Sequence, residues 1–124
     1  FGPLLDVALA VAEEFDATVV NMRFVKPLDD ALVARMAERH DLIVTLEENV
    51  VMGGAGSAVA ESLAEQGITV PLLHLGLPDR FVDHGDPAQL LAECGLNKEG
   101  VAARLHRRLA SLQPSAPAPS VRVA

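Results

Sequence analysis

Three runs of β-branched and large apolar residues limit most strongly what this chain can fold into. They cover residues 17–25, 41–48 and 69–78, and within each the apolar residues are mostly consecutive rather than alternating. Such runs are typical of strands in parallel sheets that are buried on both faces. Proline lacks the backbone donor of a central strand, so Lys26-Pro27 ends the first run, and Pro78 ends the third.

Segments with helical spacing separate these runs, and Asp29 or Asp30 and then Asp86 are suitable residues to cap two of them. The predicted helices cover 4–15, about 29–40, the stretch from the glycine cluster to Gly67, 86–95 and about 98–112. Helices alternating with apolar strands favour an α/β fold with three layers: a mostly parallel sheet with helices on both faces. Because three strands make a thin sheet and the chain opens with a helix, we expect a first strand immediately upstream of Phe1.

The charge and cysteine content narrow the classes of partner. The 124 residues include 17 acids and 10 bases, for a formal net charge of -7. This charge repels phosphate backbones and anionic headgroups, so we expect neither nucleic-acid nor membrane binding. Cys94 is the sole cysteine, which fits a reducing, cytoplasmic location. We expect one domain at 1–112 and a flexible tail at 113–124, whose composition buries little apolar area.

A glycine turn after the second predicted strand is the first candidate site. It contains Glu47, Glu48, Gly53, Gly54, Gly56 and Ser57. In a parallel sheet, this loop lies at the carboxyl edge and the next helix offers free amides, which can bind an anion. The turn lacks the third glycine of the dinucleotide fingerprint and has no P-loop lysine. Three readings stay open: a phosphate loop, a turn that needs glycine for tight packing, and a subunit or domain contact.

The two carboxylates of this turn are not expected to form an acid–base pair, because adjacent strand residues point to opposite faces. Ser57 lacks the glycine that a nucleophile elbow requires two residues later. We therefore predict no catalytic residue. His74, inside the third apolar run, is expected to be a hydrogen-bonded core histidine.

The loop after the third predicted strand is the second candidate site. It carries Gly76, Asp79, Arg80 and His84, with further acids nearby at Asp83 and Asp86. A hydrogen-bonded loop, an interface and a metal site are the alternatives. Without a second histidine at a defined spacing, we assign no metal ligands.

Three stretches match a known pattern: "NMRFVKPLD" (21–29), "LEENVVMGGAGSAVAE" (46–61) and "HLGLPDRFVDHG" (74–85). They resemble the C-terminal domain of the 1-deoxy-D-xylulose-5-phosphate synthases, a family of transketolase-like thiamine-diphosphate enzymes. The resemblance covers about residues 1–110. Its middle stretch is shared with transketolases and with the β subunits of 2-oxoacid dehydrogenases, which remain alternatives, as does a nucleotide- or phosphate-sensing module that uses Gly53–Ser57.

The resemblance implies that the parent enzyme is a homodimer that condenses pyruvate with D-glyceraldehyde 3-phosphate and releases carbon dioxide. The product feeds isoprenoid, thiamine and pyridoxal phosphate synthesis. In this family thiamine diphosphate and Mg2+ are bound by upstream domains, so the resemblance places no cofactor on this chain. It implies a structural role here, in which the sheet supports the dimer and the neighbouring domain, with 47–57 and 76–85 as the contact loops. It also implies that the isolated chain is without activity.

Overall fold

A computed structural model of the chain describes residues 1–112, and the predicted tail at 113–124 lies outside the described residues. A short 3-10 turn, η1 (Gly2–Leu4), leads directly into the first helix. The remaining elements, in chain order, are α1 (Leu5–Phe15), α2 (Asp30–Arg39), β1 (Ile43–Val50), α3 (Ala55–Glu65), β2 (Leu72–Leu77), α4 (Pro87–Glu93) and α5 (Lys98–Leu112). No helix among residues 1–112 is both long enough and apolar enough to cross a lipid bilayer.

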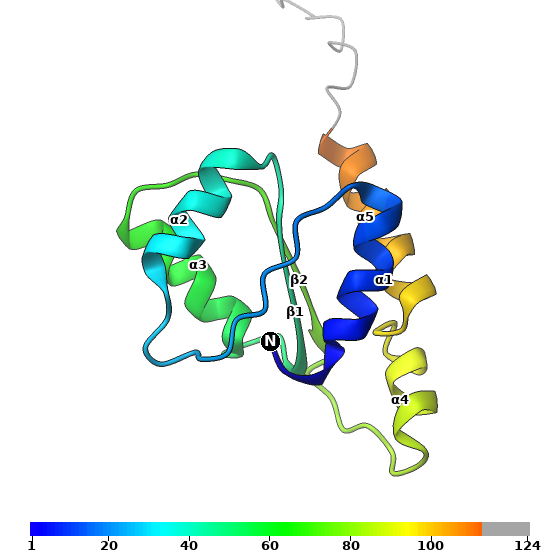
Figure 1. The fold of residues 1–124 in the computed structure, drawn as a ribbon. Coiled ribbons are helices and arrows are strands. Elements are labelled where there is room, and N and C mark those ends of the chain that lie inside the picture. Colours follow the sequence, from blue (N-terminus) through cyan, green and yellow to red (C-terminus); the bar gives the residue numbers. More distant parts are fainter. Residues whose placement is uncertain (113–124) are drawn as a thin grey trace, which may run out of the picture.

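The elements form three layers, as predicted for an α/β fold. Figure 1 shows β1 and β2 between two groups of helices, with α2 and α3 on one face and α1 and α5 on the other. The strands are parallel, with Ile43 opposite Leu72 and Thr45 opposite His74. Helix α3 connects them, which is the crossover that a parallel pair requires.

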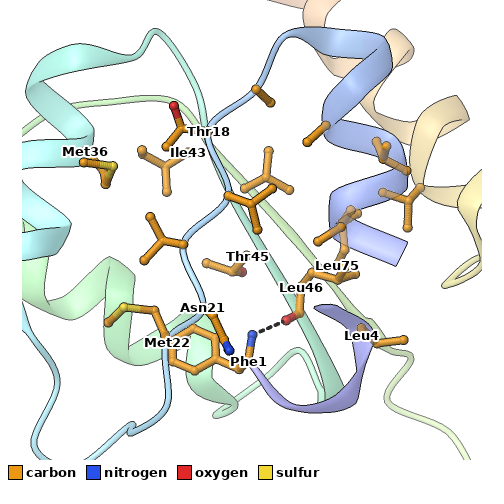
Figure 2. A pocket seen from close by; sticks show the side chains of 18 of the residues that line it. Phe1, Leu4, Thr18, Asn21, Met22, Met36, Ile43, Thr45, Leu46 and Leu75 are labelled. Atoms are coloured by element: carbon orange, nitrogen blue, oxygen red, sulfur yellow. Dashed lines mark hydrogen bonds between the residues drawn. The ribbon is translucent and has the colours of Figure 1, made fainter. Parts of the chain in front are cut away.

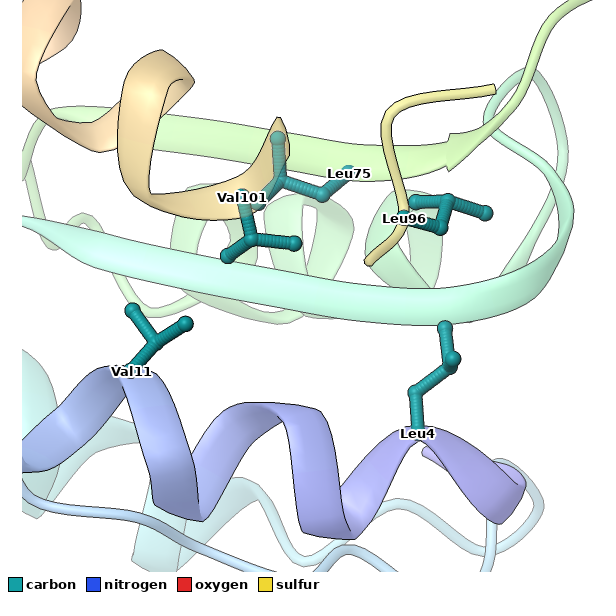
Figure 3. Packing of buried hydrophobic residues seen from close by; sticks show 5 residues of the cluster. All are labelled: Leu4, Val11, Leu75, Leu96 and Val101. Atoms are coloured by element: carbon teal, nitrogen blue, oxygen red, sulfur yellow. The ribbon is translucent and has the colours of Figure 1, made fainter. Parts of the chain in front are cut away.

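Each face of the sheet has its own core, because successive strand side chains point to opposite faces. On one face, Leu75 of β2 packs with residues from η1, α1 and the region around the start of α5: Leu4, Val11, Leu96 and Val101 (Figure 3). On the other face, Leu72 and Ile43 pack against buried residues of α2 and α3: Val33, Ala37, Val59 and Leu63.

Side-chain caps fix the starts of three helices. Asp29 Oδ1 accepts a hydrogen bond from the Leu32 amide at 2.9 Å, and Asp86 Oδ2 accepts one from the Gln89 amide at 3.0 Å. Asn97 Oδ1 likewise accepts one from the Gly100 amide at 2.9 Å, just ahead of α5. These contacts satisfy first-turn amides and confirm the predicted helix starts at Asp29 and Asp86.

The predicted buried strand at 17–25 is wrong. This segment runs in the same direction as β1 in Figure 1, but it forms no strand, and its side chains are exposed or half-buried. A strand needs a ladder partner, and the sheet of the described residues contains β1 and β2 alone. A cavity, rather than a strand, lies between residues 18–22 and β1.

A side chain of α5 bonds to the outer edge of β2. The Arg104 guanidinium of α5 donates a hydrogen bond from Nη2 to the His74 carbonyl at 3.3 Å. The amide of Ile43 donates to the Pro71 carbonyl. Because backbone groups of alternate residues point to opposite edges of a strand, those of the odd-numbered residues of β2 point toward β1, and the His74 carbonyl points away from it. A charged side chain therefore occupies one acceptor on this edge.

Candidate functional site

The glycine turn closes around the carboxylate of Glu47. This side chain lies on β1, is 1% exposed and points toward the start of α3. Its Oε2 accepts a hydrogen bond from the Ala55 amide at 2.6 Å, and its Oε1 accepts one from the Gly56 amide at 2.8 Å. A helix N-terminus favours an anion through its free amides and its dipole. The anion at this N-terminus is the chain's own carboxylate.

Two of the predicted glycines are needed because the helix approaches the sheet closely. A Cβ at Gly54 would lie 2.5 Å from Glu47 Oε2, and a Cβ at Gly56 would lie 2.5 Å from Thr45 Oγ1. Gly53 has a different role, since its φ is +75° and a Cβ there would meet open space. The geometry matches the tight-packing reading of this turn, while the amides that a phosphate would need are bonded to Glu47.

The remaining polar groups near the start of α3 bond to one another. Ser57 Oγ accepts from the Gly53 amide at 3.0 Å and donates to the Val51 carbonyl at 3.2 Å, so this hydroxyl closes the turn. Behind Gly56, Thr45 Oγ1 and His74 Nδ1 are 2.7 Å apart across the strand pair. The half-buried His74 is therefore hydrogen-bonded, as predicted.

Glu48 lies on the other side of β1 from Glu47. It is half-buried and lines a hollow of about 290 Å³ beside α4, together with Leu77, Asp83 and Cys94 among others. The two carboxylates do not converge, which is the result that strand alternation predicts.

The second candidate site is divided between a strand and a loop. Gly76 lies inside β2 and is buried, and a Cβ there would come within 2.6 Å of the Asn49 carbonyl oxygen. It is therefore a packing residue between strands rather than a loop residue. Asp79, Arg80 and His84 are exposed in the loop before α4. Within residues 1–112, no three His, Cys, Asp or Glu side chains are grouped closely enough to hold a metal ion.

Sequence reasoning missed two exposed apolar side chains on these loops. Met52 is 74% exposed in the turn after β1, and Phe81 is fully exposed in the loop after β2. Both follow the carboxyl ends of parallel strands, so they belong to the same edge of the sheet. An apolar residue among turn-forming and charged neighbours, as in "PDRFVDHG", is the signal that identifies them.

The amino group of Phe1 bonds to the free edge of β1. It donates to the Leu46 carbonyl at 2.9 Å (Figure 2). Burial lowers the pKa of this ammonium below its ordinary value of 8.0, and the nearby Glu47 carboxylate partly opposes the shift. The bond places the first residue at one end of the cavity beside β1.

Known proteins of one kind match this chain closely. It is 72% identical over 109 residues to a protein named 1-deoxy-D-xylulose-5-phosphate synthase from Thioalkalivibrio sulfidiphilus, covering 88% of this chain and 17% of that protein. Proteins of the same name from Pseudomonas entomophila and Ralstonia pickettii are 62% and 60% identical over 90% and 98% of this chain. This chain spans 18% and 19% of their lengths, so it corresponds to less than a fifth of each relative.

A solved structure described as "Split gene transketolase, inactive beta4 tetramer" has the same fold. The superposition has a TM-score of 0.75 at 34% identity and covers 86% of this chain and 35% of that one. The family model described as "Transketolase, C-terminal domain" matches residues 1–101. This match spans both cores, the glycine turn and both strands, and the chain therefore belongs to the transketolase C-terminal domain family.

Proposed function

We propose that this chain is the C-terminal assembly domain of a 1-deoxy-D-xylulose-5-phosphate synthase. The whole enzyme condenses pyruvate with D-glyceraldehyde 3-phosphate, loses carbon dioxide and acts as a cytoplasmic homodimer. The observation that carries this proposal is the 60–72% identity, over most of this chain, to proteins of that name.

The chemistry belongs to the remainder of the enzyme. Thiamine diphosphate needs groups that bind its phosphates and a site for Mg2+. The described residues offer neither. The α3 amides that suit a phosphate hold Glu47, and residues 1–112 contain no group of three metal-binding side chains. Upstream domains of the parent enzyme would hold this cofactor and its metal.

The role left to this chain is to bind other domains or a second subunit. Met52 and Phe81 give the carboxyl edge of the sheet two exposed apolar side chains, and they lie within the predicted contact segments 47–57 and 76–85. Exposed apolar side chains at one edge favour association.

A domain replacement tests this proposal directly. Residues 1–112 would replace the matching segment of the Thioalkalivibrio sulfidiphilus synthase. Formation of 1-deoxy-D-xylulose 5-phosphate would be assayed with pyruvate, D-glyceraldehyde 3-phosphate, thiamine diphosphate and Mg2+. We expect the chimaera to be active, and the relative without its matching segment to be inactive.

The 124-residue chain alone is the second arm of the experiment. We expect it to release no carbon dioxide from pyruvate under the same conditions. Turnover by the isolated chain, or a folded chimaera without activity, contradicts the proposal.

A further inference from the structure

The hollow beside α4 has apolar walls and room for an aromatic ring. Its volume is about 290 Å³, and its apolar lining comes from the end of β2, the loop after it and α4: Leu77, Val82, Leu90 and Leu91. A cavity of about 150 Å³ with apolar walls is already large enough to bind benzene. All four side chains are half-buried, so the hollow leaves apolar surface in contact with water.

An exposed aromatic side chain stands next to this hollow. Phe81 is fully exposed, whereas Val82 and Asp83, the two residues that follow it, line the hollow. Figure 1 shows their loop running from the end of β2 to α4. Phe81 does not line the hollow of its own chain. Aromatic side chains that fill a pocket on a partner dominate the binding energy of many interfaces, and here such a side chain and such a pocket lie on one surface.

The charges of the two features are complementary. The carboxylates of Glu48 and Asp83 line the hollow, and none of the residues that line it is basic. Arg80, directly before Phe81, is exposed and makes no ion pair with any residue of 1–112. An arginine and a phenylalanine that enter the hollow from outside would therefore bring a guanidinium to two carboxylates and a ring to apolar walls.

We propose that the occupant is a second copy of this chain: Phe81 of each copy fills the hollow of the other, and Arg80 pairs with the carboxylates there. Because the ring and the hollow lie side by side, one two-fold rotation makes both contacts at once, as a symmetric dimer requires. The inference rests on the contact surface of the proposed function and names its partner. Its test measures association without synthase activity, so it can fail while the enzymatic part of that proposal stands.

Analytical ultracentrifugation of the 124-residue chain tests the dimer. We expect an equilibrium between monomer and dimer. Phe81→Ser should raise the dissociation constant by about a hundredfold or more, because each dimer loses two buried rings. Phe24→Ser is the matched control and should leave the constant unchanged, since Phe24 is 66% exposed and does not line the hollow.

A second variant fills the hollow and keeps the ring. Leu90→Trp should preserve the fold, which circular dichroism checks, because Leu90 belongs to neither core and α4 contains no buried residue. Like Phe81→Ser, it should be monomeric by itself. An equimolar mixture of the two variants should form a heterodimer, in which the ring of the Leu90→Trp chain enters the intact hollow of the Phe81→Ser chain.

A charge reversal tests the polar part of the contact. Arg80→Glu should weaken the dimer roughly tenfold, because two ion pairs are lost. Adding Asp83→Arg to the same chain should restore most of the affinity, since the two charges are then exchanged across the interface.

The sole cysteine reports on the hollow itself. Cys94 lines it and is half-buried. We expect its reaction with a thiol reagent to slow as the chain is concentrated, and to lose this dependence in Phe81→Ser.

Four outcomes overturn the proposal. A chain that stays monomeric at about 100 μM would assign Phe81 to another domain of the parent enzyme, because interfaces of ordinary size form at micromolar concentration or below. A dimer that Phe81→Ser leaves unchanged would place the contact elsewhere. A mixture of the two variants that stays monomeric would exclude the exchange of rings. A Cys94 reaction that is slow at every concentration, and that Phe81→Ser accelerates, would mean that Phe81 covers the hollow of its own chain.

Discussion

At the scale of single residues, the glycine turn is organised by a buried carboxylate. Glu47 takes the two amides at the start of α3, and the nearby glycines allow the helix to approach it. The sequence correctly indicated a tight turn with amides available to an anion. It did not indicate that Glu47 itself is that anion, because this depends on how β1 and α3 pack in three dimensions.

Replacement of Glu47 by glutamine tests this contact. The side-chain amide has one acceptor oxygen, so one of the two amides at Ala55 and Gly56 loses its partner. An unsatisfied buried group costs about 1–3 kcal/mol, and we expect the free energy of unfolding to fall by about that amount. Urea unfolding measures it, and Glu48→Gln is the control, with an expected change within about 0.5 kcal/mol. Equal losses in both variants would contradict the role of Glu47.

Gly56 provides a second test at this scale. An added Cβ would meet Thr45 Oγ1 at 2.5 Å and His74 Nδ1 at 2.6 Å, so Gly56→Ala must push α3 away from the sheet. Overpacking of this kind costs about 1–3 kcal/mol. Gly85→Ala is the matched control, because its Cβ would make ordinary contacts with Leu90 at 3.7 Å or more. If the urea midpoint shifts no more for Gly56→Ala than for Gly85→Ala, the packing of α3 against the sheet at Gly56 is loose.

In the 124-residue chain produced by itself, the Phe1 ammonium makes stability depend on pH. Its pKa is lower in the folded chain than its ordinary value of 8.0, so the unfolded chain binds more protons between these two values. Stability should therefore rise with pH through this window and level off above it. The midpoint of urea unfolding, followed from pH 6 to 9, checks the direction. An N-terminally acetylated chain keeps the amide donor but does not titrate at Phe1, and it should lack this part of the rise.

At the scale of elements, the helices were predictable and one strand was not. The spacing of Val101, Leu105, Leu109 and Leu112 predicts a helix at 98–112, which is confirmed as α5. Helices are specified by local spacing and caps, both visible in a short window of sequence. A strand needs a partner elsewhere, and composition alone predicted one at 17–25 where no partner lies alongside. The ends of β1 and β2 also differ from the predicted ends by one to three residues, because pairing between strands sets them.

The cap of α2 gives a prediction at this scale. Asp29→Ala removes the acceptor for the Leu32 amide and should lower the free energy of unfolding by about 1 kcal/mol. Asp6→Ala is the control, since Asp6 lies within the first turn of α1 rather than at a cap. Thermal unfolding followed by circular dichroism would show the difference, and equal melting temperatures in the two variants would count against the cap.

At the scale of the whole molecule, the carboxyl edge of the sheet is the proposed contact surface. Sequence reasoning selected these loops through their glycines and charges, while the structure adds Met52 and Phe81. The charged residues of the second loop are exposed, and Gly76 serves the packing of the strands. Exposure depends on the whole fold, which explains why the apolar side chains were overlooked.

A double substitution tests this surface in the active chimaera described above. Met52→Ser with Phe81→Ser should weaken subunit or domain association by tenfold or more, since burying each apolar side chain contributes about 1.5–3 kcal/mol. Analytical ultracentrifugation measures the assembly and the synthase assay measures the activity. Phe24→Ser is the matched control, because Phe24 is 66% exposed outside the two loops. Unchanged assembly in the double variant would move the contact surface elsewhere.

The guanidinium of Arg104, bonded to the His74 carbonyl, places a positive charge on the outer edge of β2. Proteins that pair strands at both edges can polymerise without limit into fibrils, and a charge on one edge is a common protection against this. A strand from another molecule that paired with β2 on this side would have to displace the Arg104 side chain from the His74 carbonyl. The charge therefore disfavours pairing between copies of the chain along this edge, which is one route to aggregation.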